Sequence, residues 1–434
     1  MSDDFDDALA LANGSTAAAV TRPRRAEPGA ADPASSAACA WEQARATAAR
    51  TGTPGDPVVL PLAAALHHSL SAPLTALTDL PAFDTSAMDG WAVSGPGPWR
   101  LGEEPCVLAG DDPGPLPDGR AVAIATGARI PPGATAVLRS EHGVAAGNRL
   151  SAVSALPDGT DIRARGQECR TRDLLLHASE PVTPAVLGLA AAAGYDELEV
   201  TPLPRVEVLV LGDELLTEGV PGEGRVRDAL GPLLAPWLTA LGAEVVATRH
   251  LGDDAEALHR AVRESTADVL VTTGGTAAGP VDHVHRTLER VGATLLVDGV
   301  AVRPGHPMLL AELPAPQPGR RTRHLVGLPG NPLAAVSGLL TLAEPLLRTL
   351  ADRPAEAEQA AARLTEAVPG HPHDTRLVPV AMVTGGKASP LRYQGPAMLR
   401  GIASAAAMAV VPPGGAASGS VVRLLRLPWN RTWE

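Results

Sequence analysis

The sequence predicts a multidomain α/β protein, in which a parallel α/β domain is combined with β-rich domains. A chain of 434 residues is too long for one ordinary core and implies several domains of about 100 to 200 residues each. From Arg205 onward, strand and helix patterns alternate, which is typical of a parallel sheet covered on both faces. In 81–158 and after Pro354, Gly and Pro interrupt short apolar runs, which favours short strands and turns.

The first part of the chain begins without any apolar periodicity. Residues 1–36 mix Asp, Ala, Ser, Pro and Arg, so we expect a disordered tail. Trp41 to Arg50 is predicted to be a helix, and a second helical run is predicted from Leu60 to Leu70. Short strands are expected at Ala121 to Ala125 and at Ala134 to Leu138.

A third helix carries clear start and stop signals. Thr183 is a suitable N-cap and Pro184 a suitable first-turn residue for the helix Ala185 to Ala193, which Gly194 ends.

The α/β segment is defined by buried strands that alternate with amphipathic helices. The predicted strands are Arg205 to Leu211, Glu244 to Thr248, Asp268 to Thr273 and His324 to Leu328. The predicted helices are Asp228 to Leu241, Asp253 to Glu264, Val281 to Val291 and Leu333 to Leu350. Three short strands then follow, at Leu377 to Val383, Ala407 to Val411 and Ser420 to Leu427.

These patterns divide the chain into segments. We predict a tail (1–36), an elongated N-terminal α+β domain (37–80 with 150–203), an inserted β-rich domain (81–149), an α/β domain (204–352) and a C-terminal β domain (353–434).

Composition excludes several classes of function. A net charge of -12 argues against binding to nucleic acid or to an anionic membrane surface. Cys39, Cys106 and Cys169 have no paired spacing, so neither a disulfide scaffold nor a zinc site is indicated. The N-terminus is acidic and no run free of charge and proline is long enough to span a bilayer, so we expect a cytoplasmic protein.

Three loops that follow predicted strands are candidates for ligand binding. They are 212–215, 274–282 and 328–332. In a parallel sheet these loops lie at one edge, where glycines and helix N-termini expose backbone N–H groups to phosphate. Glu214 and Asp282 can hold a Mg²⁺ that neutralises the phosphate. Each loop alone is more simply explained by ordinary turn chemistry, whereas the three loops together favour ligand binding.

Two further features allow two interpretations each. Asn331 can cap the last helix of the α/β segment or bind a ligand ring. Asp84, Ser86 and Asp89 cluster in Pro81 to Val93, and the Asp-Gly pair there is most simply a hairpin turn.

A series of motifs in order resembles one known family. The motifs are PAFDTSAMDGWAV, ATGARIPPGA, IRARGQE, LGDEL, TTGGTAAGPVDHV, VRPGHP and LPGNP. In this order they are similar to those of the molybdopterin molybdenumtransferase (MoeA) family, including the matching region of gephyrin, from about residue 38 to the C-terminus. The ordered series is specific, whereas single motifs are not.

The resemblance implies both a fold and a reaction. The expected subunit has four domains and is elongated, with an α/β domain like that of the MoaB and Mog adenylyltransferases and an active cleft between the two subunits of a homodimer. The substrates would be adenylylated molybdopterin (molybdopterin-AMP) and molybdate, and the reaction would hydrolyse the nucleotide linkage with Mg²⁺ and place the metal on the dithiolene sulfurs. Partners would include the upstream adenylyltransferase or recipient molybdoenzymes.

The same resemblance assigns roles to matching residues. Asp89, Glu214 and Asp282 would be catalytic, and Glu168 would join Glu214 and Asp282 in metal binding. The positions expected to bind the molybdopterin nucleotide are Thr126, Gly127, Asp213, Gly274, Gly275, Arg303, His306, Pro329, Gly330, Asn331 and Pro332.

Several positions depart from the family pattern, and most of them lose a polar group. Lysines are usual where Arg303 and His306 stand. A hydroxyl-bearing residue often stands at Leu211, a serine at Ala277, a Ser-Asn or Thr-Asn pair at Ala229 and Leu230, and a serine pair at Arg400 and Gly401. Each lost neutral hydrogen bond is worth about 0.5 to 1.5 kcal/mol.

Three hypotheses therefore stand. The chain is a working molybdenumtransferase, or a diverged non-catalytic paralogue that binds molybdopterin or a partner as a scaffold, or an adenylyltransferase. The additional domains argue against the third.

Overall fold

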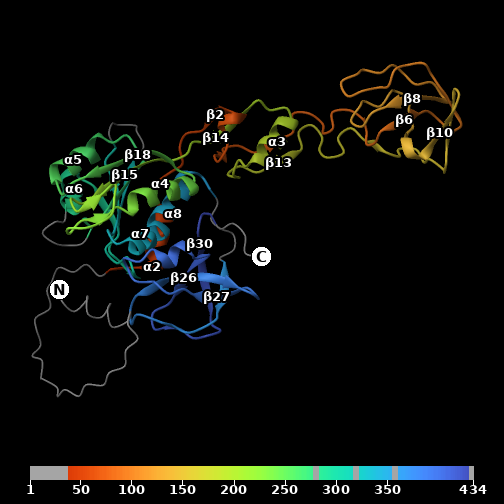
Figure 1. The fold of residues 1–434 in the computed structure, drawn as a ribbon. Coiled ribbons are helices and arrows are strands. Elements are labelled where there is room, and N and C mark those ends of the chain that lie inside the picture. The colour runs from red at the N-terminus through yellow and green to blue at the C-terminus, as the bar shows by residue number, and fades with distance from the viewer. Residues whose placement is uncertain (1–37, 277–282, 316–321, 354–359, 430–434) are drawn as a thin grey trace, which may run out of the picture. The chain divides into compact units, whose positions relative to one another are not determined.

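The computed structural model describes residues 38–276, 283–315, 322–353 and 360–429. The chain divides into two compact units, one made of Met1–Asp56 and Thr201–Glu434 and the other of Pro57–Val200 (Figure 1). The predicted tail lies outside the described residues.

The first unit contains a six-stranded sheet in the order β18-β15-β19-β23-β22-β20. Neighbouring strands from β18 to β23 are parallel, as predicted, whereas β22 is antiparallel to both β23 and β20. The parallel sheet therefore continues into an antiparallel edge that the sequence patterns did not reveal. The strands are β15 (Arg205–Leu211), β18 (Glu244–Leu251), β19 (Val269–Thr273), β20 (Thr294–Asp298), β22 (Leu309–Leu313) and β23 (Arg323–Leu328).

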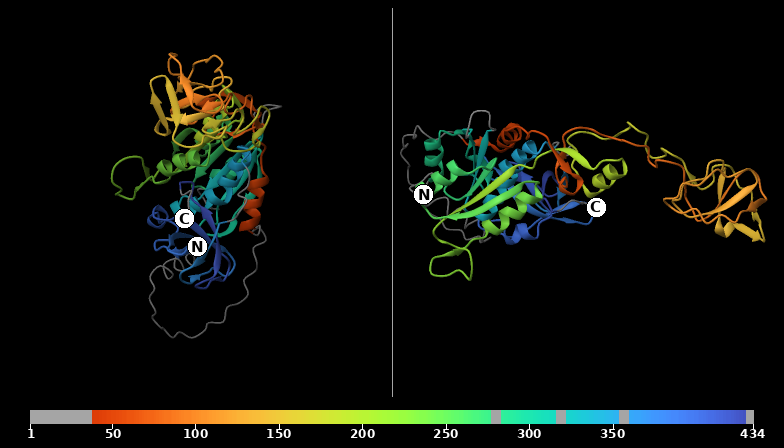
Figure 2. Two further views of the ribbon diagram at one scale, coloured as in Figure 1. Left: turned by 90° about the vertical axis from the view of Figure 1, so that its right-hand side faces the viewer. Right: turned by 90° about the horizontal axis from the view of Figure 1, so that it is seen from above.

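Alternation along the central strands explains why both faces of the sheet are covered. Val206, Val208 and Val210 of β15 belong to one buried cluster, whereas Leu209 belongs to another. Successive strand residues point to opposite faces, so each face packs its own helices (Figures 1 and 2). Helices α4 (Leu230–Ala240), α7 (Pro332–Gly338) and α8 (Glu344–Leu350) pack in the first cluster, and α5 (Ala255–Glu264) and α6 (His283–Val291) in the second.

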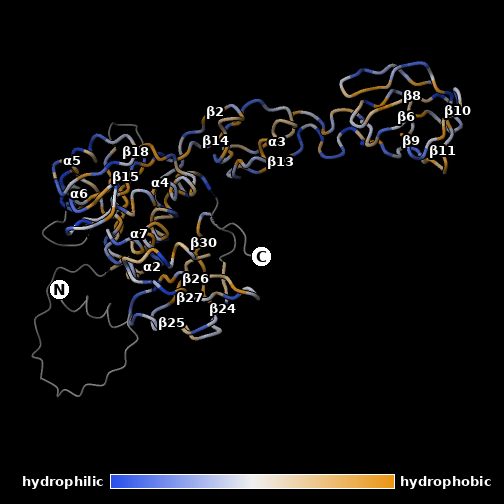
Figure 3. The backbone as a smooth tube through the Cα atoms, viewed as in Figure 1, coloured by the Kyte–Doolittle hydropathy of each residue, from blue (hydrophilic) through white to orange (hydrophobic). Residues whose placement is uncertain are grey.

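The predicted helix Leu333 to Leu350 is continuous but not regular. A π-helical segment, Leu339–Ala343, joins α7 to α8. The 19-residue stretch Pro332–Leu350 is long and apolar enough to cross a membrane by length and composition alone, but 89% of the window is buried inside the unit. The stretch therefore has the burial of a core helix, and Figure 3 shows hydrophobic residues concentrated in this region.

The first unit also includes α2 and a second sheet. Helix α2 (Trp41–Arg50) has the predicted limits, and the Trp41 indole N–H donates to Thr341 Oγ1 at 2.9 Å. The second sheet has the order β1-β21-β26-β27-β24-β30-β28. Its strands are β1 (Cys39–Ala40), β21 (Val300–Arg303), β24 (Ala361–Leu364), β26 (Thr375–Val383), β27 (Lys387–Pro390), β28 (Ala407–Val411) and β30 (Val421–Arg426). The three predicted C-terminal strands are confirmed as β26, β28 and β30.

The second unit holds a six-stranded sheet and a small α+β part. The sheet has the order β10-β11-β7-β8-β6-β9, with the predicted strands at β8 (Arg120–Ile124) and β9 (Ala136–Arg139). The other strands of this sheet are β6 (Gly90–Val93), β7 (Trp99–Leu101), β10 (Gly143–Ala146) and β11 (Arg149–Ala152). Helix α3 (Pro184–Ala192) has the predicted cap, since Thr183 Oγ1 accepts from the Val186 N–H at 3.3 Å.

The predicted helix Leu60 to Leu70 is wrong. The segment instead forms β2 (Val58–Pro61), a single 3₁₀ turn and β3 (Ser69–Leu70). Strand β2 pairs antiparallel with β14 (Glu197–Thr201), and β3 lies on the other side of β14. Pairing with a strand more than a hundred residues away overrides local helix propensity, which is a weak preference.

Candidate functional site

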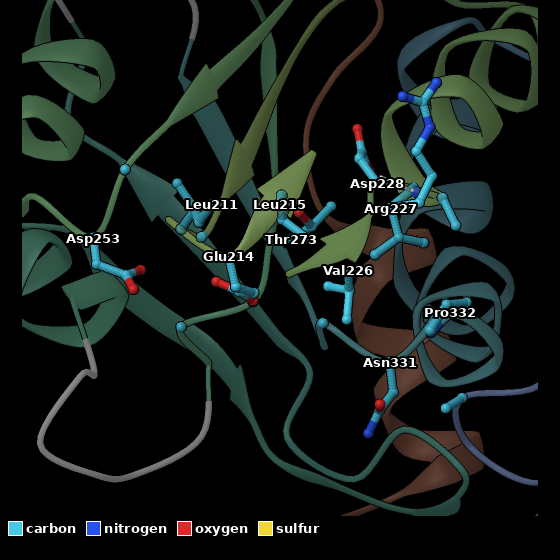
Figure 4. A pocket seen from close by; sticks show the side chains of 18 of the residues that line it. Leu211, Glu214, Leu215, Val226, Arg227, Asp228, Asp253, Thr273, Asn331 and Pro332 are labelled. Carbon is cyan, nitrogen blue, oxygen red and sulfur yellow. Dashed lines mark hydrogen bonds between the residues drawn. The ribbon is translucent and has the colours of Figure 1, made fainter. Parts of the chain in front are cut away.

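A cavity of about 700 Å³ lies at the carboxyl ends of β15, β19 and β23, within the size range of ligand sites. All three predicted loops contribute to its wall, so their convergence at one edge is confirmed for the described residues. The wall is made of Leu211, Gly212, Glu214, Leu215, Val226, Arg227, Asp228, Ala229, Leu230, Gly252, Asp253, Asp254, Leu258, Thr273, Gly274, Gly275, His283, Gly330, Asn331, Pro332, Ala397 and Leu399. Figure 4 shows Glu214 between Asp253 and Asn331.

The first loop places Glu214 in the cavity wall by folding its side chain back over Gly212. Gly212 has a φ of 137°, and a Cβ there would lie 2.6 Å from Glu214 Oε2. The positive φ favours glycine, and the missing Cβ leaves room for the Glu214 carboxylate. Asp213 is not part of the wall, and its carboxylate lies beside Gly252, where a Cβ would come within 2.4 Å of Oδ1.

The second and third loops touch each other through glycines. The Gly274 N–H donates to Leu328 O at 2.9 Å, and a Cβ on Gly330 would lie 3.6 Å from the Gly274 Cα. Gly274 and Gly275 have φ values of 78° and 64°, which favour glycine. Asp282 and Ala277 lie outside the described residues.

Asn331 occupies the N-cap position of α7, but its side chain makes no capping hydrogen bond. Instead, the Pro396 carbonyl accepts from the N–H groups of Leu333 and Ala334, at 2.8 and 3.3 Å. These N–H groups are therefore not offered to an anion, contrary to the expectation for this helix N-terminus. The Asn331 amide is left exposed in the cavity wall, which leaves the ligand-binding interpretation in place.

The ionisable side chains in the wall are mainly acidic. Among the described residues, the wall contains four carboxylates, Glu214, Asp228, Asp253 and Asp254, beside one arginine, Arg227, and one histidine, His283. Asp254 caps α5, and the backbone N–H groups of Ala257 and Glu256 hold the pKa of its carboxyl below the usual value. An anionic ligand in such a cavity needs a cation to offset the carboxylates.

The carboxylate oxygens of the wall suit a hard cation. Mg²⁺ takes one or two carboxylates and keeps water or phosphate oxygens as its other ligands. Glu214 fits such a role. Among the described residues no group of three or more His, Cys, Asp or Glu side chains is arranged to enclose a metal ion, and Asp282 is outside that set. The residues present therefore suit a shared protein and substrate site rather than an all-protein cage.

Sequence reasoning missed the pairing of Asp228 with His250. Asp228 is 5% exposed and accepts from the His250 Nε2–H at 2.7 Å. The two residues stand 22 positions apart on different elements, and no motif relates them. The only signal in the sequence was the position of Asp228 as an N-terminal residue of the predicted helix.

In the second unit, two predicted site residues are brought together. The Asp89 carboxylate accepts from the Thr126 N–H at 2.7 Å, and the Gly127 N–H donates to Ser86 O at 2.8 Å. The Asp-Gly pair does not form the predicted hairpin turn, because β6 begins at Gly90 and pairs with β8 and β9, whereas the preceding strand β5 (Thr85–Ser86) pairs with β12 (Ile162–Arg163). Glu168 is exposed in the same unit, and its backbone N–H donates to Leu80 O at 2.9 Å.

Arg303, His306 and Pro329 do not line the cavity. Arg303 ends β21, and its Nε–H donates to Asp374 Oδ2 at 2.8 Å. His306 Nδ1 lies 2.8 Å from Val300 O. The Arg303 charge is thus partly neutralised by a carboxylate that is only 8% exposed.

Three positions that depart from the family pattern line the cavity. Leu211, Ala229 and Leu230 all belong to its wall, and Leu230 also packs in the main core. Arg400 and Gly401 lie in the short helix α9 (Arg400–Ala403), where the Arg400 guanidinium donates to Tyr393 Oη at 2.9 Å. The cavity wall is therefore less polar than the resemblance implies.

Comparison with family models accounts for most of the chain. Residues 39–194 match the MoeA N-terminal region (domains I and II), residues 207–349 match a probable molybdopterin binding domain, and residues 361–427 match the MoeA C-terminal region (domain IV).

Similar proteins agree with these matches. The chain is 34% identical over 303 residues to the molybdopterin molybdenumtransferase of Synechococcus elongatus, covering 66% of this chain and 74% of that protein. It is 33% identical over 319 residues to molybdopterin molybdenumtransferase 2 of Mycobacterium tuberculosis, covering 67% and 75%. A solved molybdopterin biosynthesis moea protein from Pyrococcus horikosii shares the fold, with a TM-score of 0.71 at 24% identity over 91% of this chain and 100% of that chain. The chain therefore belongs to the molybdopterin molybdenumtransferase (MoeA) family.

Proposed function

We propose that this chain is a molybdopterin molybdenumtransferase that inserts molybdate into adenylylated molybdopterin, with Mg²⁺-dependent release of AMP. The observation that carries the proposal is the cavity of about 700 Å³ at the carboxyl ends of three parallel strands, with Glu214 in its wall. Its size suits a nucleotide-linked pterin, and family membership gives the class of reaction.

In this proposal Glu214 and Asp282 would hold Mg²⁺, which would supply positive charge for the pyrophosphate of the substrate. The ion would neutralise the phosphate charge, which the acidic wall would otherwise repel. Glu168 is the third proposed ligand. Gly274, Gly275 and Gly330 line the cavity and would let the backbone approach the phosphates closely, and Asn331 would contact a ring of the ligand.

Asp89 and Thr126 would complete the site from the second subunit of a homodimer. The hydrogen bond from the Thr126 N–H leaves one oxygen of the Asp89 carboxylate available. We propose that this oxygen orients the water that attacks the nucleotide linkage, so that one P–O bond breaks and AMP leaves. Arg303 and His306 are proposed to attract the molybdate oxyanion.

The direct test is cofactor formation from purified adenylylated molybdopterin, molybdate and Mg²⁺. Glu214→Gln should lower AMP release by about 100-fold or more, because one of the ligands that hold the cation is lost. Glu218→Gln is the matched control, since it removes the same charge four residues away, at an exposed position outside the cavity wall. Wild-type protein that yields no product at any molybdate concentration would end the proposal.

A second function is favoured by a specific observation. Leu211, Ala229 and Leu230 replace polar residues in the cavity wall itself, so hydrogen bonds to the ligand are lost where it would lie. A non-catalytic molybdopterin-binding paralogue or scaffold would bind the nucleotide without releasing AMP. Equilibrium binding measured beside turnover separates the two, and consumption of ATP with free molybdopterin would instead indicate adenylyl transfer.

We also propose that the protein acts as a cytoplasmic homodimer, with the upstream adenylyltransferase or recipient molybdoenzymes as transient partners. Sedimentation of the full chain tests the dimer.

A further inference from the structure

The pair formed by Asp228 and His250 is the most completely bonded ionisable cluster beside the cavity. Asp228 Oδ1 accepts from the N–H groups of Leu230 and Gly231, both at 2.9 Å. Asp228 Oδ2 accepts from His250 Nε2 at 2.7 Å. An ionised carboxylate has no proton to donate, so the His250 ring carries its proton on Nε2. Both oxygens of the Asp228 carboxylate therefore already accept hydrogen bonds from the protein.

Gly231 keeps space for this pair. A Cβ at Gly231 would lie 2.3 Å from Asp228 Oδ2 and 3.4 Å from His250 Nε2. Glycine is otherwise unfavourable within a helix, where it costs about 1 kcal/mol relative to alanine. Its presence in the first turn of α4 is therefore explained by the close approach of the carboxylate and the imidazole.

The pair is linked to Glu214 through the backbone. The Asp228 N–H donates to Leu216 O at 2.9 Å, and the Val226 N–H donates to Glu214 O at 3.0 Å. These bonds belong to the pairing of β16 (Leu215–Leu216) with β17 (Val226–Arg227). The hydrogen bonds to the Asp228 side chain thus fix β17, the short strand that donates a hydrogen bond to the Glu214 backbone carbonyl.

We propose that His250 is a positioning residue for Glu214: it anchors Asp228 and β17, and so holds Glu214 at the place where a Mg²⁺-bound phosphate would lie. The inference deepens the proposed function and rests on it for the identity of the ligand. His250 does not line the cavity, so its effect on the site is transmitted through Asp228, which does.

The variants follow from the geometry. His250→Phe removes the donor and keeps the ring, whereas His250→Gln places an amide N–H near the former Nε2 and should restore the bond. The asparagine side chain of His250→Asn is shorter and should not restore the hydrogen bond to Asp228. Gly231→Ala adds a Cβ against Asp228 and should reproduce the loss while favouring the helix. His259→Phe, on α5 and outside the cavity wall, is the matched control.

Two readouts test the proposal on the full-length protein. The first is the Mg²⁺ concentration for half-maximal AMP release, which His250→Phe, His250→Asn and Gly231→Ala should raise by about 10- to 100-fold, as is typical when a residue supporting a metal ligand is removed. His250→Gln and His259→Phe should stay close to wild type. The second is hydrogen exchange of the Val226 and Asp228 amides, which should become faster in the same three variants.

The outcomes separate the two proposals. A wild-type protein without turnover refutes the proposed function, and the exchange measurement then decides the role of His250. Unchanged amide exchange in His250→Phe, or an unchanged Mg²⁺ dependence in an active His250→Phe protein, overturns the inference. Failure of His250→Gln to restore either readout overturns it as well.

Discussion

At the scale of single residues, carboxylates hold the loops of both units in place by accepting several hydrogen bonds at once. Asp79 accepts from the Thr171 N–H and Thr171 Oγ1, both at 2.8 Å, and from Arg165 Nε at 2.6 Å. The bond from the Thr171 backbone N–H, followed by those from the two side chains, lowers the pKa of Asp79 to about 2. These bonds favour the ionised form.

This shift predicts how stability depends on pH. The pKa of Asp79 is lower in the folded chain than the value of about 3.9 in an unfolded chain, so its contribution is complete above pH 4 to 5 and is lost as pH falls toward 2. The difference in urea midpoint between wild type and Asp79→Asn should be constant from pH 5 to 8 and shrink below about pH 4. A difference that does not change with pH would contradict the assignment.

Leu230 shows why a polar position of the family can be lost. Its side chain is 5% exposed and packs in the main core while it also borders the cavity. Leu230→Asn should lower the free energy of unfolding by about 2 to 5 kcal/mol, as for truncation of a buried leucine, because an amide replaces core packing. Ala229→Ser, at the half-buried neighbouring position, should change it by less than about 1 kcal/mol. Denaturant titration measures both, and equal effects would exclude a core role for Leu230.

At the scale of elements, capping side chains set where helices begin. Thr183 caps α3, Asp254 caps α5, and Asp228 serves the N-terminus of α4. Each acceptor satisfies an N–H group that has no partner within the helix. The three capping residues differ in location. Asp228 and Asp254 also belong to the cavity wall, whereas Thr183 lies in the other unit.

Removal of the α3 cap should weaken the second unit. Thr183→Ala loses the acceptor for the Val186 N–H and should lower the free energy of unfolding by about 1 kcal/mol. Thr183→Ser keeps the hydroxyl and should stay within about 0.5 kcal/mol of wild type. The measurement is denaturation followed through the transition of the second unit, and an alanine variant as stable as the serine variant would show that the cap adds nothing.

At the scale of the whole molecule, the second unit is an insertion into the first. The chain enters it at β2 and leaves it at β14, and these strands pair antiparallel, with Val58 opposite Val200. The two ends of the insertion are therefore close together, whereas the cavity wall is drawn entirely from the first unit.

Replacing 57–200 by a short Gly-Ser linker should leave the first unit folded. The shortened chain should retain the cavity and bind the nucleotide substrate, but it should not release AMP, since Asp89 and Thr126 have been removed. Circular dichroism measures whether the shortened chain is folded, equilibrium binding measures its affinity for the nucleotide substrate, and the turnover assay measures AMP release. Loss of folding, or turnover without the insertion, would show that the division of roles between the units is wrong.

Much of this organisation could be predicted from local patterns. The strand Arg205–Leu211 and the helix Trp41–Arg50 have the predicted limits, because long apolar runs and strong helix formers agree with their surroundings. The helix predicted at Leu60 to Leu70 failed because its partner strand is distant in sequence. The antiparallel strands β20 and β22 were missed, and so was the contact of His250 with Asp228, because each depends on which chain segments become neighbours.

The fold class, the three loops that follow strands and the family could all be predicted before any tertiary contact was known, because apolar periodicity, glycine placement and the order of the motifs can be recognised along the chain. Three contacts could be identified only in the folded chain: Pro396 accepts from the first N–H groups of α7, Arg303 pairs with Asp374, and His250 holds Asp228 beside the cavity. Hydrogen bonds act over about 3 Å, so such partners are fixed by packing rather than by spacing along the chain.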